Sequence, residues 1–215
     1  MDLFEAVETA NLKELQEAIN EGMNLNIQNE EGFTPLHSAA FNEQTEMIKI
    51  LLTANADPDI QCLDGSTPFH LIAEIGNLEG VEAFIQAGVN VNIETDGCSA
   101  PLYLASMYDH TDCMTALIQA GADVNLQNNE GNTALHSAAV NDHIDSVKLL
   151  LQNGADPTIQ NQYGFTPEKS AEDYPAIQAV FRDYRISQEQ KTLREVPMPE
   201  NLPERHTPRI GRGRL

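Results

Sequence analysis

The chain repeats itself with a period of 33 residues. Residues 32–40 read GFTPLHSAA and return almost unchanged as GNTALHSAA at 131–139. A shorter copy begins at Gly65, a partial copy is recognisable from Ala100, the third position of its unit, and a fainter copy begins at Gly164. The third positions of the five copies fall at 34, 67, 100, 133 and 166, so no insertion breaks the register. A fixed period of this size predicts an array of stacked units, each burying its apolar face against its neighbours.

Within one period, the residue pattern predicts two short helices. Thr34 can cap the first helix, and Pro35 suits its first turn, where the backbone needs no N–H donor. Ala39 and Ala40 are small and let a second helix approach closely. The second helix is predicted by apolar residues at helical spacing in each unit, namely Met47, Ile48, Leu51, Leu52; Leu78, Val81, Phe84, Ile85; Met114, Leu117, Ile118; and Ile144, Val147, Leu150, Leu151. Each of these helices is followed by a residue that tolerates a left-handed backbone and ends it: Asn55, Gly88, Gly121 and Gly154.

The two ends of the array differ from its middle. Residues 1–28 lack the motif but keep its phase and predict an amphipathic helix with a solvated acidic face. In the last unit Glu168 and Lys169 replace Leu-His, which suits an end that faces solvent. Apolar spacing after Pro175 predicts a capping helix of two turns or more. We therefore expect a repeat domain of about six units over 1–185, the outer two being caps, and a flexible, basic, Pro-rich tail over 186–215.

Charge is distributed unevenly between these two parts. Six basic and 29 acidic residues precede Ile186, which gives a net charge of −23, whereas residues 186–215 carry six basic and four acidic residues, a net charge of +2. An acidic body repels phosphate backbones and attracts basic protein segments. We therefore expect a protein partner and no nucleic acid. No apolar run is long enough to cross a membrane, so no membrane partner is expected either.

The repeated motif resembles the ankyrin repeat. The resemblance rests on Thr-Pro-Leu-His-x-Ala-Ala, on a second helix ending in Leu-Leu, and on Gly-Ala-Asp-Val-Asn at 121–125, all in one 33-residue register over about residues 1–185. It implies an all-α solenoid in which each unit is a β-turn followed by two antiparallel helices. The fourth unit departs most from the motif, because Cys98, Ala100 and Tyr103 replace its Gly, Thr and His.

The recurring histidines could be mistaken for catalytic groups or metal ligands. His37, His70 and His136 occupy one repeat-equivalent position, so they are spread along the stack and do not converge. The resemblance implies that this histidine forms hydrogen bonds between neighbouring turns. Cys98 has no assigned histidine partner, and the chain has no nucleophile elbow, Cys-x-x-Cys or phosphate loop. We therefore expect no enzyme activity, no cofactor and no metal site.

The resemblance also implies where a partner binds, namely at the turn tips and the inner surface of the first helices. An apolar row recurs there at Phe41, Ile75, Met107, Tyr108 and Val140. It is bordered by the carboxylates Glu30, Glu31, Asp64, Glu74, Asp96, Asp109 and Glu130. Apolar anchors inside a polar rim are typical of protein interfaces. The candidate partner-binding residues are Phe33, Phe41, Leu63, Glu74, Ile75, Met107, Tyr108, Val140, Asn141, Tyr163 and Phe165.

These observations predict a monomeric, non-catalytic interaction module that binds a basic or amphipathic protein segment on its acidic concave face. Two alternatives stay open for the tail. It can be the export signal of a secreted bacterial effector that binds a host protein, or the mask of a regulatory subunit or inhibitor. Three cysteines without ligand spacing indicate free thiols in a reducing compartment. We expect a cytoplasmic protein, with the nucleus, or the host cytosol for an effector, as alternatives.

Overall fold

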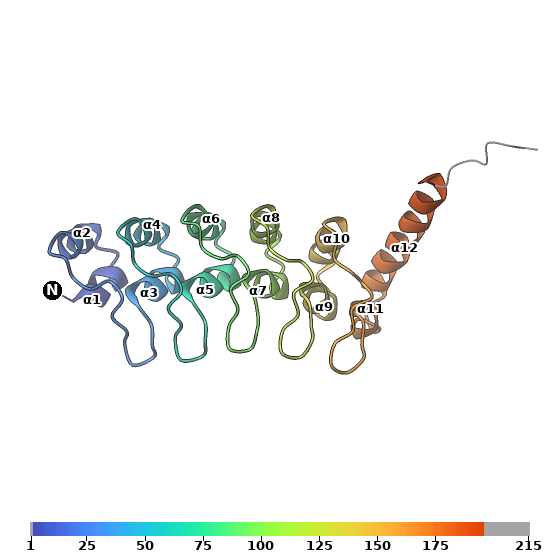
Figure 1. Cartoon of the computed structure of the whole chain (residues 1–215), viewed down its shortest axis with the longest axis horizontal. Helices are drawn as coiled ribbons and strands as arrows, with labels where there is room; N and C mark the ends of the chain where they lie inside the picture. Colours follow the sequence, from blue (N-terminus) through green and yellow to red (C-terminus); the bar gives the residue numbers. More distant parts are fainter. Residues whose placement is uncertain (1, 196–215) are drawn as a thin grey trace, which may run out of the picture.

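Twelve helices form two layers in a computed structural model that describes residues 2–195 (Figure 1). The first helices of the six units are α1 (Leu3–Glu8), α3 (Pro35–Phe41), α5 (Pro68–Ile75), α7 (Pro101–Met107), α9 (Ala134–Val140) and α11 (Pro167–Ser170). The second helices are α2 (Leu12–Asn20), α4 (Thr45–Thr53), α6 (Leu78–Gln86), α8 (Thr111–Gln119), α10 (Ile144–Gln152) and α12 (Pro175–Glu195). No strand occurs within residues 2–195. The expected all-α ankyrin solenoid is confirmed.

Each first helix begins where the Thr-Pro signal predicts. The hydroxyl of Thr34 accepts from the His37 N–H at 3.3 Å, and the Thr34 N–H donates to His37 Nδ1 at 3.0 Å. Thr133 and His136 repeat this capping arrangement in the fifth unit. Ala100 has no hydroxyl and caps α7 with no side-chain hydrogen bond, although α7 is as long as α3. The departures in the fourth unit therefore leave its helices intact.

The core runs continuously between the two layers. In the inner layer α3 packs on α5, α5 on α7, α7 on α9 and α9 on α11, and the second helices stack in the same order behind them. Repeat-equivalent residues of the first helices fill the core: Leu36, Phe69, Leu102 and Leu135, which are at most 2% exposed. Each unit buries its apolar face against its neighbours, so the core is built from contacts within a unit and between adjacent units.

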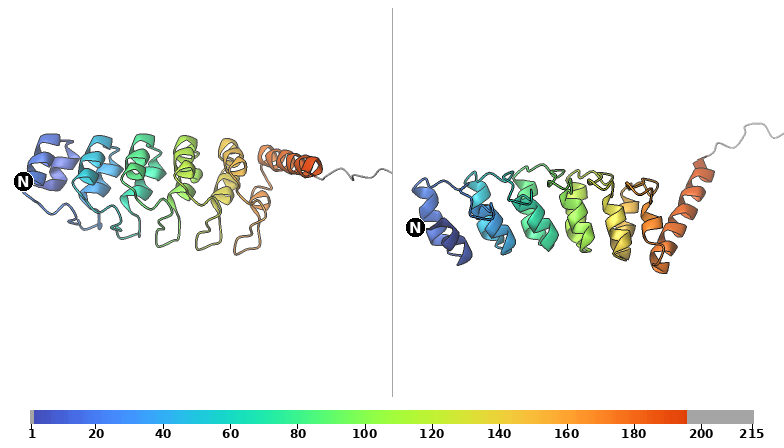
Figure 2. Two further views of the ribbon diagram at one scale, coloured as in Figure 1. Left: turned by 45° about the horizontal axis from the view of Figure 1, so that its top comes forward. Right: turned by 90° about the horizontal axis from the view of Figure 1, so that it is seen from below.

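Long loops link successive units, and a β-turn forms the tip of the loop. In the first loop the Gly32 N–H donates to the Asn29 carbonyl at 3.0 Å, which closes the turn. Main-chain and amide groups join neighbouring loops. The Leu63 N–H donates to the Glu31 carbonyl at 3.2 Å, and Gln28 Nε2 donates to the Gln61 carbonyl at 3.1 Å. These contacts hold the loop tips in a row along one edge of the array (Figure 2).

The connection between the two helices of a unit requires a left-handed residue. Ala10, Glu43, Gly76, Asp109 and Asp142 stand at this position, with φ of 52°, 54°, 84°, 59° and 60°. Of these five residues, only Gly76 adopts the left-handed backbone without strain, because it has no side chain. A Cβ at this position would also collide with the ring of His110. The other four residues hold a conformation that is unfavourable for a residue with a side chain.

The exchange Ala10→Gly is expected to raise the free energy of unfolding by about 0.5–1 kcal/mol, because glycine removes the strain of the left-handed backbone. The matched control is Ala87→Gly. Ala87 is also exposed and also ends a helix, but its φ is −72°. There glycine is expected to lower stability by about 0.5–1 kcal/mol. Urea unfolding measures both changes, and changes of the same sign in the two variants would contradict the explanation.

The last helix extends farther than the sequence pattern predicts. Ile177 and Phe181 of α12 are buried, as expected for a capping helix. Helical order continues past residue 186, where the flexible tail is expected to begin, because α12 ends at Glu195. Residues 187–195 contain mostly Gln, Glu, Lys, Leu and Arg, which favour helix without needing a buried face. The rest of the predicted tail, 196–215, lies outside the described residues, and the boundary of the repeat domain stays a prediction.

Within residues 2–195, no helix combines the length and the apolar character that crossing a membrane requires.

Candidate partner-binding groove

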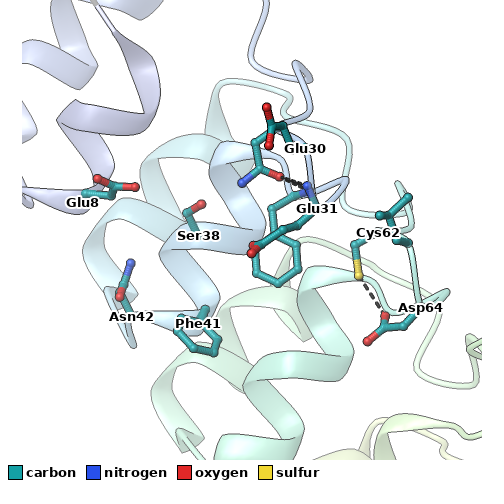
Figure 3. Close-up of a pocket in the computed structure, with 11 residues that line it drawn as sticks. Glu8, Glu30, Glu31, Ser38, Phe41, Asn42, Cys62 and Asp64 are labelled. Atoms are coloured by element: carbon teal, nitrogen blue, oxygen red, sulfur yellow. Dashed lines mark hydrogen bonds between the residues drawn. The ribbon is translucent and has the colours of Figure 1, made fainter.

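A groove of about 760 Å³ opens between the first three units. It lies where the loop tips of units 2 and 3 meet the exposed side of α3, with α1 at its far edge (Figure 3). Its lining residues are Glu8, Asn29, Glu30, Glu31, Phe33, Ser38, Phe41, Asn42, Cys62, Leu63 and Asp64. The structure thereby brings together three of the predicted residues, Phe33, Phe41 and Leu63, which are up to 30 positions apart in sequence.

The apolar part of the groove is built on two phenylalanines. Phe33 stacks on the ring of His37 with centroids 5.3 Å apart. Phe41, at the last position of α3, is tilted against Phe33 with centroids 6.3 Å apart. Phe41 is 61% exposed and Leu63 is 78% exposed. Neither side chain is needed by the core, so both are available to a partner.

The acidic part of the groove consists of Glu8, Glu30, Glu31 and Asp64, and no Lys or Arg lines it. Asp64 is held in place, because its Oδ1 accepts from the Cys62 thiol at 2.9 Å and from the Ser66 N–H at 2.9 Å. These two hydrogen bonds lower the pKa of Asp64 below its ordinary value. A fixed carboxylate that stays ionised suits a cationic partner.

The sequence pattern does not mark Glu8 as a partner contact, because the first unit lacks the Thr-Pro-Leu-His motif. The signal was present in the register, since Glu8 stands 33 positions before Phe41 and Glu74 stands 33 positions after it. Phe41 therefore has a carboxylate at the equivalent position of each neighbouring unit. The acidic surroundings extend along the array, since no Lys or Arg occurs between Lys49 and Lys148.

The predicted apolar row is interrupted in units 3 and 4. The Tyr108 hydroxyl donates to Glu74 Oε1 at 3.1 Å, and this hydrogen bond raises the pKa of Tyr108. Tyr108 also stacks on His110 with centroids 6.1 Å apart, and His110 Nε2 is 2.9 Å from the Glu74 carbonyl. Ile75 and Met107 are half-buried beside this cluster. The middle of the inner face thus offers a fixed Glu–Tyr pair in place of free apolar side chains.

The remaining predicted residues lie toward the C-terminal end of the array. Val140 is 48% exposed and lines a separate cavity of about 150 Å³. Asn141 donates from Nδ2 to the Ser137 carbonyl at 2.9 Å, so its amide is already used. Tyr163 and Phe165 are exposed on the last loop. None of these residues lines the groove of units 1–3, so the eleven predicted residues do not form one site.

The repeated histidines are structural links. His37 Nε2 lies 3.1 Å from the Ser66 carbonyl, His70 Nε2 lies 3.0 Å from the Ile93 carbonyl, and His136 Nε2 lies 3.0 Å from the Phe165 carbonyl. Each ring therefore joins its own unit to the next loop. Residues 2–195 contain no group of three His, Cys, Asp or Glu side chains arranged to hold a metal ion.

Comparison with known proteins supports the same reading of the fold. A sequence profile of the family described as "Ankyrin repeats (3 copies)" matches residues 3–95, 46–128 and 69–161. The chain belongs to the ankyrin repeat family. The crystal structure of EF0377, an ankyrin repeat protein, superposes on this ankyrin repeat protein with a TM-score of 0.79 at 27% identity, covering 85% of this chain and 96% of that chain. No curated protein matches the sequence.

Ankyrin repeats are generally protein–protein interaction modules, and the family is typically non-enzymatic. In this ankyrin repeat protein the groove is the place where exposed apolar side chains and carboxylates of three units meet.

Proposed function

We propose that this ankyrin repeat protein binds a basic or amphipathic protein segment in the groove of units 1–3. The observation that carries the proposal is Phe41, an aromatic side chain that is 61% exposed in a groove with four carboxylates and no Lys or Arg. A phenylalanine that is mostly exposed contributes little to folding, and its apolar surface is removed from water when a partner covers it.

The two parts of the groove have different roles in this proposal. Phe33, Phe41 and Leu63 provide apolar area, which slows dissociation once a partner has docked. The aromatic faces also attract a Lys or Arg side chain that lies over them. The carboxylates guide a basic segment to the groove and raise the association rate, most strongly at low salt. The stack presents these groups on a rigid scaffold, so little ordering cost accompanies binding.

The proposal predicts that Phe41→Ala weakens binding of an amphipathic Lys/Leu peptide by about tenfold or more, which corresponds to about 1.4 kcal/mol or more. Fluorescence anisotropy with the labelled peptide measures the dissociation constant. A second peptide with Gln in place of each Lys should bind more weakly, and a third with Glu should not bind. Raising the salt concentration should slow association of the Lys peptide and leave its dissociation nearly unchanged.

The matched control is Leu12→Ala, which removes an apolar side chain that is 44% exposed on α2, in the outer layer. It should leave peptide affinity unchanged. A second comparison separates local from overall charge, because Glu30→Gln with Glu31→Gln should slow association more than Glu79→Gln with Glu82→Gln on α6. Equal affinity of wild type and Phe41→Ala, or equal effects of the two Glu pairs, would exclude the groove as the binding site.

A further inference from the structure

One segment of the chain itself has the chemistry that the groove of units 1–3 favours. Residues 205–215 read RHTPRIGRGRL and contain four Arg, one His and no acidic residue. Ile210 and Leu215 lie among the arginines and supply apolar side chains. The segment is therefore both basic and partly apolar. The body before Ile186 has only six basic residues, so no other stretch of the sequence concentrates positive charge in this way.

The groove complements this segment in charge and in the kinds of side chain that it offers. Four carboxylates line it without any Lys or Arg. The Phe33–Phe41 pair, with centroids 6.3 Å apart, offers aromatic surface over which a guanidinium can stack while its N–H groups reach a carboxylate. Arginine is favoured over lysine in such a setting because its planar group can stack and donate at the same time.

The position of α12 bears on whether the segment binds the groove of its own chain or the groove of a second copy. The groove lies in units 1–3, whereas α12 leaves the array at the opposite end and leans away from it (Figures 1 and 2). With 21 residues, α12 is about 30 Å long at 1.5 Å per residue. Returning to the groove of the same chain means crossing the length of α12 and at least two units of about 10 Å each.

The reach of the intervening chain is too short for the first half of the segment. Arg205 stands ten positions after Glu195, which permits about 35 Å of fully extended chain. That is less than the roughly 50 Å that the route along α12 and two units requires. Arg212 and Arg214 would reach the groove, but only with a strongly extended backbone. A second copy can offer the same segment without this restriction.

From these observations we infer that segment 205–215 of one copy binds the groove of units 1–3 of another copy. The inference rests on the proposed function, since it names an occupant for the same groove. The contact is heterologous, because the surfaces that meet are different: the copy that supplies its segment keeps a free groove, and the copy that receives it keeps a free segment. Association is therefore open-ended and depends on concentration and salt, and at low concentration the chain is the monomer that we expect from the sequence.

Sedimentation velocity of the full-length chain with complementary variants tests the inference. The groove variant carries Phe41→Ala and Glu31→Gln, both at exposed positions. The segment variant carries Arg209→Gln and Arg212→Gln. Wild type should gain mass with concentration at low salt, and each variant should associate at least about tenfold more weakly. An equal mixture of the two variants should form dimers and stop there, because each mixed pair has one intact groove and one intact segment.

The matched control for charge is Lys191→Gln with Arg194→Gln. Both residues are exposed on α12, and the exchange removes the same two positive charges. This variant should associate like wild type. Circular dichroism of all variants checks that each is folded before its mass is compared.

Three outcomes would overturn the inference: wild type that stays monomeric at low salt, association unaffected by the segment variant, or a variant mixture that forms no dimer. The Lys/Leu peptide distinguishes the two proposals. If the peptide binds the groove while the chain stays monomeric, the inference is wrong and the proposed function stands. If neither the peptide nor a second copy binds, both are wrong.

Discussion

Replacing Leu135 by alanine is expected to lower the free energy of unfolding by about 2–5 kcal/mol. Leu135 lies in α9 and is 0% exposed. Its helix packs on α7, α10 and α11, so the exchange leaves a cavity in the core that α9 shares with its neighbours. In a stacked array, such a loss weakens the unit itself and its interfaces with both neighbours. Urea unfolding followed by circular dichroism measures the change.

The control for this experiment is Leu63→Ala, which removes the same atoms from a side chain that is 78% exposed. Its effect on stability should stay within about 0.5 kcal/mol, as for most surface exchanges. If Leu135→Ala lowers the free energy of unfolding by less than about 1 kcal/mol, Leu135 is not a central residue of the core of its unit.

A second large effect is expected when the pH falls. Burial lowers the pKa of His70 from 6.5 to about 4, and burial also lowers the pKa of His37 and of His136. The folded chain then binds fewer protons than the unfolded chain between these values. Stability contributed by the neutral His70 is complete above pH 6.5 and is lost as the pH falls toward 4, by about 3 kcal/mol in total.

Burial is the main cause of the lowered pKa of His70, and the hydrogen bond at Nδ1 acts in the same direction. Its Nδ1 accepts from the Thr67 N–H at 3.1 Å, and its Nε2 lies 3.0 Å from the Ile93 carbonyl. A neutral ring that carries its proton on Nε2 satisfies both groups, whereas a proton on Nδ1 would point at another N–H.

Urea unfolding between about pH 7 and about pH 4.5 measures this dependence, and the slope that His70 contributes approaches about 1.4 kcal/mol per pH unit between its unfolded and folded pKa values. His70→Gln should be less stable at neutral pH and should have a flatter slope by about that amount. An unchanged slope in His70→Gln would assign the acid sensitivity to other groups.

The sequence predicts the fold well because the fold is local and repeated. Thr34, Pro35 and Leu36 specify a cap, a first turn and a core contact within a few residues, and the 33-residue register then places every other unit. The end of α12 was missed because its exposed residues are held by helix propensity and leave no apolar pattern.

The candidate site is less predictable, because it depends on contacts across units. The register placed Phe41 at the end of a first helix and Leu63 at a loop tip, but it did not predict that Tyr108 would form a hydrogen bond with Glu74 and divide the apolar row. Helical spacing also does not predict the position of a loop tip relative to the helices. That position brings Leu63 and Asp64 to the same groove as Glu8.

The histidine hydrogen bonds that join neighbouring units have an evolutionary consequence. His37 and His136 each reach the main-chain carbonyl of a tip residue, Ser66 in one loop and Phe165 in the other. A carbonyl is present whatever side chain that residue carries. Mutations of side chains at the loop tips can therefore change which molecule is bound while these hydrogen bonds between units stay in place. Binding preference and folding stability can thus evolve independently in this chain.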